Sequence, residues 1–352
     1  MNFSSILLSW YAINKRPLPW RSDIKPYKIW LSEIIFQQTR IDQGIAYYHR
    51  FIEAYPDILQ LANASIDSVL KLWQGLGYYS RARYLHQTAN IIINNFQGEF
   101  PQDLKELKKL PGIGNYTAAA IASICFGKSE PVLDGNAIRV YCRFLGIAGD
   151  TTKSSTRSEI MKAANSLISE KHPGDYNQAV MEFGALHCTP ANPDCSTCPF
   201  RNHCSAYRQK TVSHIPYKNP STKKKNRHFH YFCISDESLS FIYLLKRQKK
   251  DIWNGLYEFP MIETEKESSL EELFSIVFFS QHFKKDLHIR STENPAKHIL
   301  SHQNLFLCFY HIIIGEEQNL IPGSDWIKIK TSVVHEYPVA KPIADYLQKL
   351  LK

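Results

Sequence analysis

Four cysteines lie close together in this chain, and no other feature restricts its possible folds so strongly. Gaps of six, two and five residues separate Cys188, Cys195, Cys198 and Cys204. Four thiolates on one loop can surround a single centre, and soft sulfur ligands select zinc or an iron–sulfur cluster. A zinc ribbon normally has two CxxC pairs, whereas this segment has one CxxC with wide, unequal gaps. The pattern favours a [4Fe–4S] cluster, with zinc as the alternative.

The rest of the composition indicates a reducing compartment and an anionic partner. The other four of the 8 cysteines are scattered in apolar segments, which is typical of small buried residues and not of a disulfide framework. The N-terminal segment has no basic cluster and no cleavage site, and no apolar stretch approaches about 20 residues. We therefore expect a cytoplasmic protein that does not span a membrane. The formal net charge of +9 favours nucleic acid as the partner.

The 352 residues suggest about two domains, and the first is expected to be helical. Amphipathic segments separated by Pro and Gly run to about residue 185, and no sustained alternation of apolar and polar residues interrupts them. Asp67 and Asp103 are expected near helix starts. We predict a helical domain over residues 1–207, which includes the cysteine loop 188–204.

The pattern changes in the second part of the chain. Residues 208–228 are rich in Lys and Arg and contain no Asp or Glu, which predicts a basic linker that is either a solvated tether or a contact for DNA phosphates. Residues 229–352 are predicted to form an α/β domain. Its expected strands are 230–234, 240–247 and 305–314, and its expected helices are 270–283 and 340–352.

Residues 104–127 predict two helices joined by a tight turn. Pro111 ends the first helix, Gly112 and Gly114 permit unusual φ values in the turn, and the second helix begins at Asn115. Backbone N–H groups at such a turn point outward and can hold a phosphate. We interpret the segment as a helix-hairpin-helix whose glycines contact the DNA backbone, with a simple corner between two helices as the alternative.

Two carboxylates lie in surroundings that suit acid–base chemistry. Glu33 lies in KIWLSEIIF, where almost every neighbour is apolar, so its carboxyl should resist ionisation. Asp134 follows Gly114 by twenty residues and precedes Gly135 and Asn136. It can cap the next helix or face a cleft, and its position after the hairpin favours a functional role.

In combination, these features and six further motifs resemble the endonuclease III branch of DNA glycosylases, and specifically the MutY-type adenine DNA glycosylases. The motifs are PLPWR (17–21), SEIIFQQTR (32–40), LWQGLGYYSRAR (72–83), LPGIGNYTA (110–118), VLDGN (132–136) and YNQAVMEFGALHC (176–188). The resemblance covers nearly the whole chain. It implies a two-lobed, all-helical helix-hairpin-helix glycosylase domain with a [4Fe–4S] loop, followed by a Nudix-like α/β domain.

The resemblance assigns catalytic roles to residues of the motifs. Glu33 would protonate adenine at N7, and Asp134 would stabilise the oxocarbenium ion of the sugar. Asn136 would orient Asp134. Bifunctional relatives carry a Lys at the position of Tyr116, and its amine forms a Schiff base with the sugar. A phenol cannot form an imine, so we expect a monofunctional glycosylase that leaves an abasic site.

The resemblance also implies how DNA is bound. A glycosylase extrudes the target nucleotide and fills the gap that is left in the duplex. Gln38 and Tyr78 would be the wedges, although GYYSRAR could instead be a packed aromatic pair with a solvated basic end. The residues that would surround the extruded adenine are Trp20, Arg21, Gln178 and Glu182.

The C-terminal part resembles the Nudix-like domain of the same family, beginning at KRQKKDIWNGLYEFP (246–260). The hydrolase motif REXXEE is absent from IETEKESSLEELF (262–274), so we expect no pyrophosphatase activity. The family reads 8-oxoguanine with a Phe-Ser-His motif. Ser301 and His302 match it, whereas Leu300 replaces the Phe and removes an aromatic face.

The leading hypothesis is a monomeric, nucleoid-associated base excision repair enzyme. It would remove adenine opposite 8-oxoguanine or guanine in double-stranded DNA. The alternatives are another endonuclease III-like glycosylase and a non-catalytic iron–sulfur DNA-binding protein. A Nudix hydrolase with a helical appendage is a third. Tyr116 and the additional domain argue against another glycosylase, and intact Glu33 and Asp134 argue against a non-catalytic protein.

Overall fold

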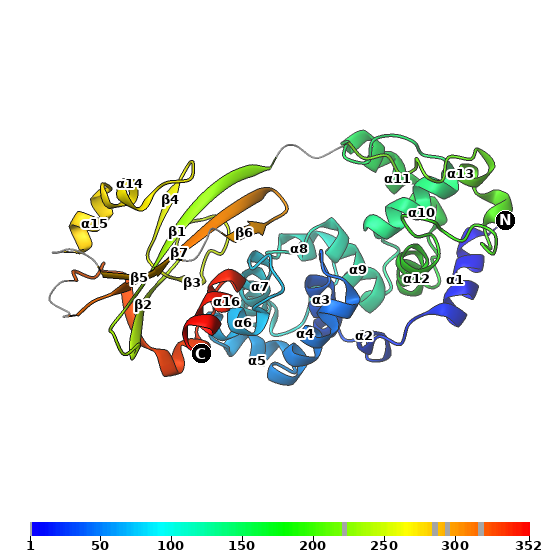
Figure 1. Ribbon diagram of the computed structural model, residues 1–352. Coiled ribbons are helices and arrows are strands. Elements are labelled where there is room, and N and C mark those ends of the chain that lie inside the picture. The colour runs from blue at the N-terminus through cyan, green and yellow to red at the C-terminus, as the bar shows by residue number, and fades with distance from the viewer. Residues whose placement is uncertain (1, 220–223, 284–287, 293–295, 316–319) are drawn as a thin grey trace. The chain divides into compact units, whose positions relative to one another are not determined.

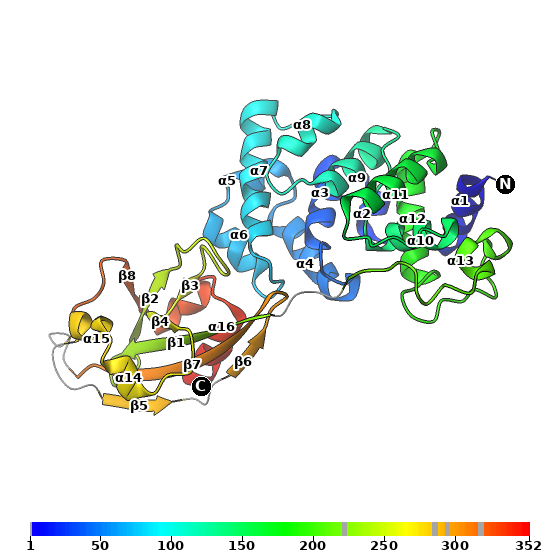
Figure 2. The ribbon, with the colours of Figure 1, turned by 90° about the horizontal axis from the view of Figure 1, so that it is seen from above.

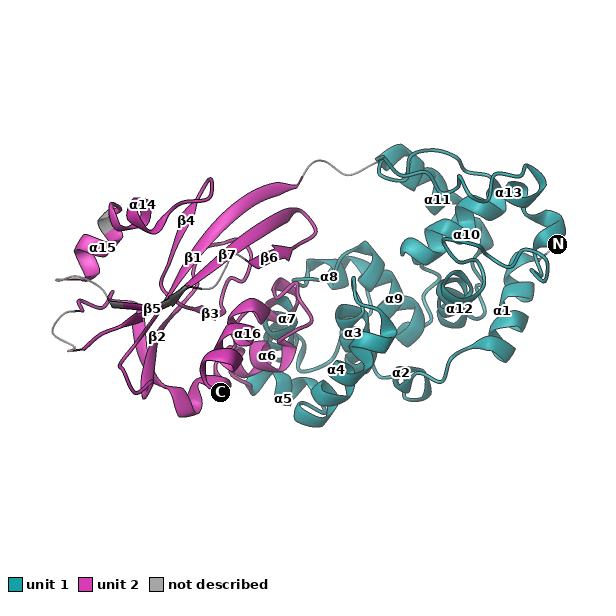
Figure 3. Cartoon of the chain, viewed as in Figure 1, with its two compact units in different colours: residues 1–63, 84–221 teal, residues 64–83, 222–352 magenta. Residues whose placement is uncertain are grey.

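The computed structural model describes residues 2–219, 224–283, 288–292, 296–315 and 320–352 (Figures 1 and 2). Four residues of the expected linker, 220–223, lie outside the described residues. Within the described ranges, no helix is long and apolar enough to cross a membrane. Contacts divide the chain into two compact units (Figure 3). We call residues 1–63 and 84–221 the helical unit, and residues 64–83 and 222–352 the mixed unit.

The helical unit confirms the helical character expected up to about residue 185. In addition to most of α7 (Ser80–Phe96), it contains α1 (Phe3–Asn14), α2 (Pro19–Ser22), α3 (Pro26–Ile35), α4 (Ile41–Ala54), α5 (Ile58–Asn63), α8 (Leu104–Lys109), α9 (Asn115–Phe126), α10 (Gly135–Leu145), α11 (Ser154–Leu167), α12 (Pro173–Leu186), the short helix η1 (Arg201–His203) and α13 (Ser205–Arg208).

The helix-hairpin-helix consists of α8, a turn at 110–114, and α9. The carboxylate of Asp103 caps α8 by accepting hydrogen bonds from the backbone N–H groups of Lys105 and Glu106, as expected for a helix start. In the turn, Gly112 has φ +76°, and the hydroxyl of Thr88 donates to the carbonyl of Pro111 at 2.8 Å. The turn is therefore held both by its own backbone conformation and by a side chain of α7.

Helices α10 and α12 approach each other closely at the start of α10. A Cβ atom on Gly184 of α12 would lie 2.7 Å from the Cβ of Asn136 and 2.9 Å from its carbonyl oxygen. Real Cβ atoms essentially never come that close, so a glycine is required there. The apolar faces of both helices form one core with α1, through residues that include Leu7, Tyr141 and Phe183. Close packing thus fixes the position of the residues at the N-terminus of α10.

The mixed unit contains an eight-stranded sheet in the described part of the chain. The strand order is β3-β2-β1-β7-β5, with β4 paired to β1, β6 to β7 and β8 to β2. The strands are β1 (Lys225–Ser235), β2 (Phe241–Lys246), β3 (Tyr257–Glu258), β4 (Met261–Thr264), β5 (His288–Thr292), β6 (Ala296–Ile299), β7 (Gln303–Ile313) and β8 (Trp326–Lys330). The helices are α6 (Ile66–Trp73), α14 (Leu270–Phe274), α15 (Val277–His282), η3 (Thr331–Glu336) and α16 (Lys341–Leu350).

The central strands β1 and β7 are parallel and are buried on both faces of the sheet. Phe232 and Tyr310 belong to the core that includes Leu273 of α14 and Phe279 of α15. On the opposite face, Phe309 stacks on Tyr346 of α16, with ring centroids 4.5 Å apart. Burial on both faces explains why these strands are continuous apolar runs, and the expected strands are confirmed.

The expected helix 270–283 is two helices, because Ile276 has an extended backbone with φ −75° and ψ 140°. Leu273 and Phe279 are six residues apart, so in one continuous helix they would point about 120° away from each other. The extended residue lets both side chains enter the same core. Tertiary packing therefore overrides the local helical pattern.

The segment 64–83 separates from its sequence neighbours and belongs to the mixed unit. Helix α6 begins at Ile66 with Ser65 as its cap, so Asp67 lies in the first turn, near a helix start as expected. The carboxylate of Asp67 accepts hydrogen bonds from Lys246 at 2.6 Å and from the Tyr257 hydroxyl at 2.9 Å. The boundaries predicted at 207 and 229 remain predictions, and the contact division does not follow chain order.

The two glycines of the hairpin turn should respond differently to substitution. A Cβ on Gly112 would lie 2.8 Å from the Cβ of Tyr84 at positive φ, whereas a Cβ on Gly114 meets nothing within 4 Å. We expect Gly112→Ala to lower the free energy of unfolding by about 1–3 kcal/mol. The matched control Gly114→Ala should change it by less than about 0.5 kcal/mol. Urea denaturation measures both, and equal losses would contradict the assigned role of Gly112.

Candidate active site

One cavity of the helical unit, about 600 Å³ in volume, collects most of the residues that the sequence singled out. We call it the carboxylate cavity. Its wall includes Trp20, Arg21, Glu33, Gln38, Tyr116, Asp134, Asn136, Gln178 and Glu182. An adjoining groove of about 870 Å³ shares Glu33, Gln38 and Tyr116 with the cavity and reaches Gly112 and Gly114 of the hairpin. Segments that are more than 100 residues apart in the chain therefore meet at one concave site.

Glu33, on α3, is bonded to Tyr116 of α9. The Tyr116 hydroxyl donates to the Glu33 carboxylate, with 2.5 Å between the oxygens, and lies 3.2 Å from the sulfur of Met181. Burial and, to a smaller extent, the charge of Asp134 raise the pKa of Glu33, and they outweigh the opposing hydrogen bond from Tyr116, so the pKa is about 7. This is the direction that the apolar neighbours of Glu33 in the sequence indicate. At neutral pH a large fraction of Glu33 carries a proton that it can donate.

Asp134 caps α10 and also lines the carboxylate cavity. Its Oδ1 accepts from the backbone N–H of Ala137 at 2.6 Å, and its Oδ2 accepts from the side-chain amide of Asn136 at 2.8 Å. The two interpretations of this residue, helix cap and cleft residue, therefore both apply. Burial raises the pKa of Asp134 above its ordinary value, and these hydrogen bonds and the charge of Arg139 oppose that rise. The capping geometry orients the carboxylate while leaving it in the cavity wall.

Glu182, on α12, is held by two arginines. Arg16 donates to it with its backbone N–H, Nε and Nη2, and Arg21 donates with Nη1 and Nη2, at 2.8–2.9 Å. Burial raises the pKa of Glu182, but the hydrogen bonds from both arginines outweigh this effect and lower the pKa to about 2. Nε of Arg21 also donates to Gln178 at 3.1 Å. The sequence analysis missed Arg16, whose place next to PLPWR was the available signal.

Arg139 was also missed, and it connects the carboxylate cavity to the cysteine loop. Its guanidinium donates to Asn136 Oδ1 at 2.8 Å, to the carbonyl of Gly184 at 2.7 Å and to the carbonyl of Cys188 at 2.7 Å. The side chain lies largely buried among these partners. Its place directly after the VLDGN motif, in VLDGNAIR, was the signal that could have identified it.

The four clustered cysteines line one small cavity of the helical unit. Burial and the neighbouring sulfurs of Cys188, Cys204 and Cys195 together raise the pKa of Cys198 to about 12. Four thiolates can coexist here only if positive charge is added, which a metal centre supplies. Among the described residues, no three His, Cys, Asp or Glu side chains are close enough to hold one metal ion. A [4Fe–4S] cluster takes one thiolate at each iron and does not require such convergence.

The surroundings of the cysteine loop also suit a cluster. Arg143 of α10 donates to the carbonyls of Thr189, Pro190 and Ile215, and its Nη1 lies 3.5 Å from the sulfur of Cys188. Nε2 of His187 is buried in the cavity wall and has no hydrogen-bond partner in the part of the chain that the structure describes. Donors of this kind suit the sulfurs of an anionic cluster.

A second cavity, of about 470 Å³, lies in the mixed unit, and we call it the turn cavity. It is lined by residues 75–80, by 251–253 and by 298–303, which include the predicted reader residues Leu300, Ser301 and His302. The hydroxyls of Tyr78 and Ser301 are hydrogen-bonded to each other. Tyr78 is 45% exposed, whereas Tyr79 is buried. Of the two tyrosines, Tyr78 is therefore the one with a ring available to DNA.

Both predicted wedge residues have strained backbone conformations. Gln38 has φ +63° and Tyr78 has φ +48°, in the left-handed region that residues other than glycine rarely adopt. Such conformations persist where the surrounding structure enforces them, and they cluster at binding sites. The neighbouring Gln37 donates to the hydroxyl of Thr117 at 3.2 Å, next to the hairpin. The strain therefore marks two positions at which the backbone presents a side chain outward.

Comparisons with known proteins agree with this architecture. Residues 31–166 match the HhH-GPD superfamily of base excision DNA repair proteins, and residues 230–349 match the NUDIX domain. The solved structure of a thermostable thymine-DNA glycosylase superposes on 59% of this chain and 95% of its own, with a TM-score of 0.53 and 28% identity. The chain is thus a base excision repair DNA glycosylase with an added Nudix-like domain, and the expected fold class is confirmed.

Curated relatives narrow this class. An adenine DNA glycosylase of Buchnera aphidicola subsp. Schizaphis graminum is 38% identical over 266 residues, which cover 74% of this chain and 75% of that protein. An adenine DNA glycosylase of Mus musculus is 44% identical over 216 residues, which cover 59% of this chain and 42% of that protein, so the chain spans less than half of its length. The chain belongs to the adenine DNA glycosylase family, which confirms the resemblance of its motifs.

The ion pairs of Glu182 with Arg16 and Arg21 should make the free energy of unfolding depend on pH. The folded pKa of about 2 lies below the ordinary value of 4.5, so the stabilisation is complete above pH 4.5 and is lost as the pH falls towards 2. We expect Glu182→Gln to lower the free energy of unfolding at pH 7 by about 3 kcal/mol. The difference from wild type should shrink between pH 4.5 and 2. Urea denaturation across this range measures it, and a difference independent of pH would contradict the assignment.

Proposed function

We propose that this enzyme excises adenine that is paired with 8-oxoguanine or guanine in double-stranded DNA, and that it leaves an abasic site. The observation that carries the proposal is the contact between Tyr78 and Ser301 in the turn cavity. It joins the predicted wedge to the predicted reader of the opposite base. Ser301 and His302 are exposed there and offer donors and acceptors to a base edge. The adenine itself would enter the carboxylate cavity.

Hydrolysis of the N-glycosidic bond needs a protonated leaving base and a stabilised sugar cation. Glu33, with a pKa of about 7, is suited to donate a proton to N7 of adenine. Asp134, with its carboxylate oriented by Asn136 and the start of α10, would stabilise the oxocarbenium ion. Arg21, Gln178, Glu182 and the buried ring of Trp20 would position the extruded base.

The monofunctional mechanism rests on the residues around the sugar site. A β-lyase needs an amine that attacks the sugar C1′. At the hairpin position where bifunctional relatives carry this lysine, the chain has Tyr116. No lysine is among the described residues that line the carboxylate cavity. The phenol of Tyr116 is committed to Glu33, and burial raises its pKa well above the ordinary value. Tyr116 therefore serves to position Glu33 and does not form an imine.

We also propose that Cys188, Cys195, Cys198 and Cys204 hold a [4Fe–4S] cluster. When bound, the cluster would supply a redox-active, positively charged core that fixes the thiolates on one loop. Arg201 in this loop faces the same cavity and, with Arg208 and Lys210, lines a neighbouring surface pocket. These cations are suited to contact DNA phosphates. We further propose that the enzyme acts as a monomer in the cytoplasm.

Single-turnover cleavage of a labelled duplex with one central adenine tests the substrate and the mechanism. We expect breaks in the adenine strand only after hot alkali, fastest opposite 8-oxoguanine, slower opposite guanine and slowest opposite thymine. The abasic product is stable until alkali cleaves it. Breaks without alkali, or a stoichiometric adduct trapped by borohydride, would mean a lyase mechanism. Equal rates opposite all three bases would overturn the proposed reading of 8-oxoguanine.

The pH dependence of excision tests Glu33. Since the acid must hold its proton, the single-turnover rate should fall as the pH rises through about 7. The Tyr116 hydroxyl favours the ionised carboxylate, so Tyr116→Phe should move this inflection to higher pH. Glu33→Gln should lower the rate by orders of magnitude while DNA binding is retained. Tyr217→Phe, which changes an exposed tyrosine of the same unit, is the control. If Tyr116→Phe leaves the inflection where it is in wild type, the coupling between Tyr116 and Glu33 is refuted.

A further inference from the structure

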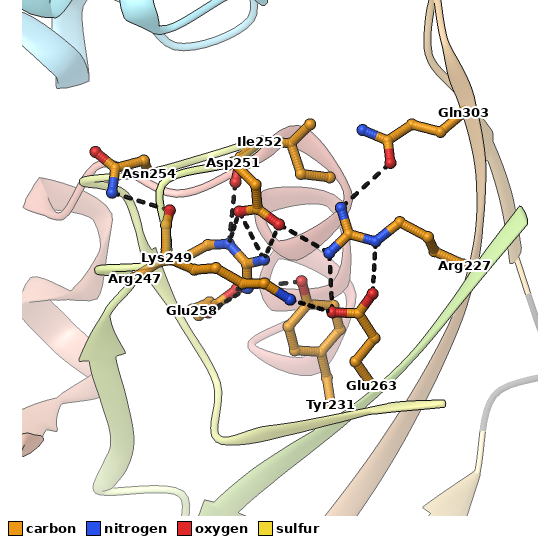
Figure 4. A network of polar contacts seen from close by, with 10 residues as sticks. All are labelled: Arg227, Tyr231, Arg247, Lys249, Asp251, Ile252, Asn254, Glu258, Glu263 and Gln303. Carbon is orange, nitrogen blue, oxygen red and sulfur yellow. Dashed lines mark hydrogen bonds and ion pairs between the residues drawn. The ribbon is translucent and has the colours of Figure 1, made fainter. Parts of the chain in front are cut away.

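Figure 4 shows a compact network of charged side chains, and Asp251 and Gln303, which take part in it, also line the turn cavity. The network joins four separate segments of the mixed unit, namely β1, β3, β4 and the loop after β2. Three cations and three anions make it neutral overall: Arg227, Arg247, Lys249, Asp251, Glu258 and Glu263. The side chains of Arg227 and Arg247 are 8% and 4% exposed, so their guanidinium groups are shielded from solvent, whereas Lys249 lies at the exposed end of the network.

Asp251 is the centre of this network because it bridges both arginines. Its Oδ2 accepts from Arg227 at 2.8 Å and from Arg247 at 2.9 Å, and its Oδ1 accepts from Arg247 at 2.9 and 3.1 Å. Arg247 also donates to the carbonyl of Ile252 at 3.0 Å. The backbone N–H of Gly255 donates to the carbonyl of Arg247, which closes the loop. The loop 247–255 is thereby folded around one guanidinium.

Arg227 connects this loop to the turn that carries the reader residues. Its Nη1 donates to the side chain of Gln303 at 3.2 Å, and Gln303 directly follows His302. The turn is closed by the backbone N–H of Leu300, which donates to the carbonyl of Gln303 at 2.9 Å. Lys224 and Lys225 also donate to the carbonyls of Leu300 and His302. The turn is therefore held at its base, while Ser301 and His302 at its tip are exposed.

The two connected segments both line the turn cavity. Its lining includes Asp251, Ile252 and Trp253 from the loop after β2, and residues 298–303 from the turn. The rings of Trp253 and His298 lie 5.8 Å apart. Trp253 has φ +59°, a strained conformation that the folded loop imposes. The bridge from Arg247 through Asp251 and Arg227 to Gln303 thus connects the two segments that line the cavity.

We propose that Asp251 and Gln303 are positioning residues for the opposite base: they set the place of Ser301 in the turn cavity and thereby the preference for 8-oxoguanine over guanine. This inference rests on the proposed function. The two bases differ only at the N7 and C8 edge, so a reader can separate them with very few hydrogen bonds. Such bonds are sensitive to displacements of a fraction of an ångström. Excision of adenine takes place in the other unit and does not itself require this network.

The test compares single-turnover excision of adenine opposite 8-oxoguanine and opposite guanine, and takes the ratio of the two rates. We expect Asp251→Asn to lower the ratio about tenfold, which corresponds to ~1.4 kcal/mol, with the rate opposite guanine nearly unchanged. Gln303→Met should lower the ratio as well. Because it leaves every ion pair intact, it keeps the test valid even if Asp251→Asn folds poorly. Asp236→Asn is the matched control, because Asp236 bonds to Ser238 and Ser240 away from the cavity.

A double-mutant cycle with Ser301→Ala separates positioning from general destabilisation. If Asp251 and Gln303 act through Ser301, then Asp251→Asn or Gln303→Met added to Ser301→Ala should lower the ratio no further. Provided that Ser301→Ala lowers the ratio, two outcomes would overturn the inference. In one, the losses multiply in the double variants; in the other, the ratio stays at the wild-type value in both Asp251→Asn and Gln303→Met. If wild type shows no preference and Ser301→Ala has no effect, the proposed function itself fails and the inference fails with it.

Discussion

The buried guanidinium of Arg139 joins its own helix, α10, to the end of α12 and the start of the cysteine loop, which lie about 45 residues further along the chain. It bonds to Asn136 at the start of α10, to the end of α12 and to the first residue of the cysteine loop. Because Asn136 in turn donates to Asp134, the catalytic candidate is oriented by a side chain one turn further along its own helix. The contact of Gly184 with Asn136 permits this geometry, since any larger residue would separate α10 from α12.

Within the carboxylate cavity, the environment gives chemically similar carboxyls opposite properties. Burial with a single neutral donor raises the pKa of Glu33 to about 7, whereas two guanidinium groups lower the pKa of Glu182 to about 2, although it is also buried. The first can act as an acid at neutral pH and the second remains a fixed charge that holds Arg16 and Arg21. The division of roles therefore follows from the neighbours of each carboxyl and not from its residue type.

The mixed unit illustrates how far the site depends on contacts between distant segments. Residues 64–83 lie within the part of the chain that matches the HhH-GPD superfamily, yet they pack with residues 222–352. This grouping places Tyr78 against Ser301, which follows it by 223 positions. The charged network around Asp251 also bonds to this turn through Gln303. The proposed recognition residues thus lie on surface loops, and the sheet, which is buried on both faces, provides a rigid base for them.

The sequence by itself determined the features that are encoded by local spacing. These were the helical first part, the hairpin from Pro111 to Asn115, the buried strands and the clustered cysteines, together with the motif residues of the carboxylate cavity. Only the tertiary structure decided what depends on long-range packing. It broke the helix at Ile276, bonded Asp67 to Lys246 and Tyr257, and paired Arg16 with Glu182 and Arg139 with Cys188. Local patterns fix which face of an element is apolar, but partners far apart in the chain are chosen by packing, which no short window of sequence contains.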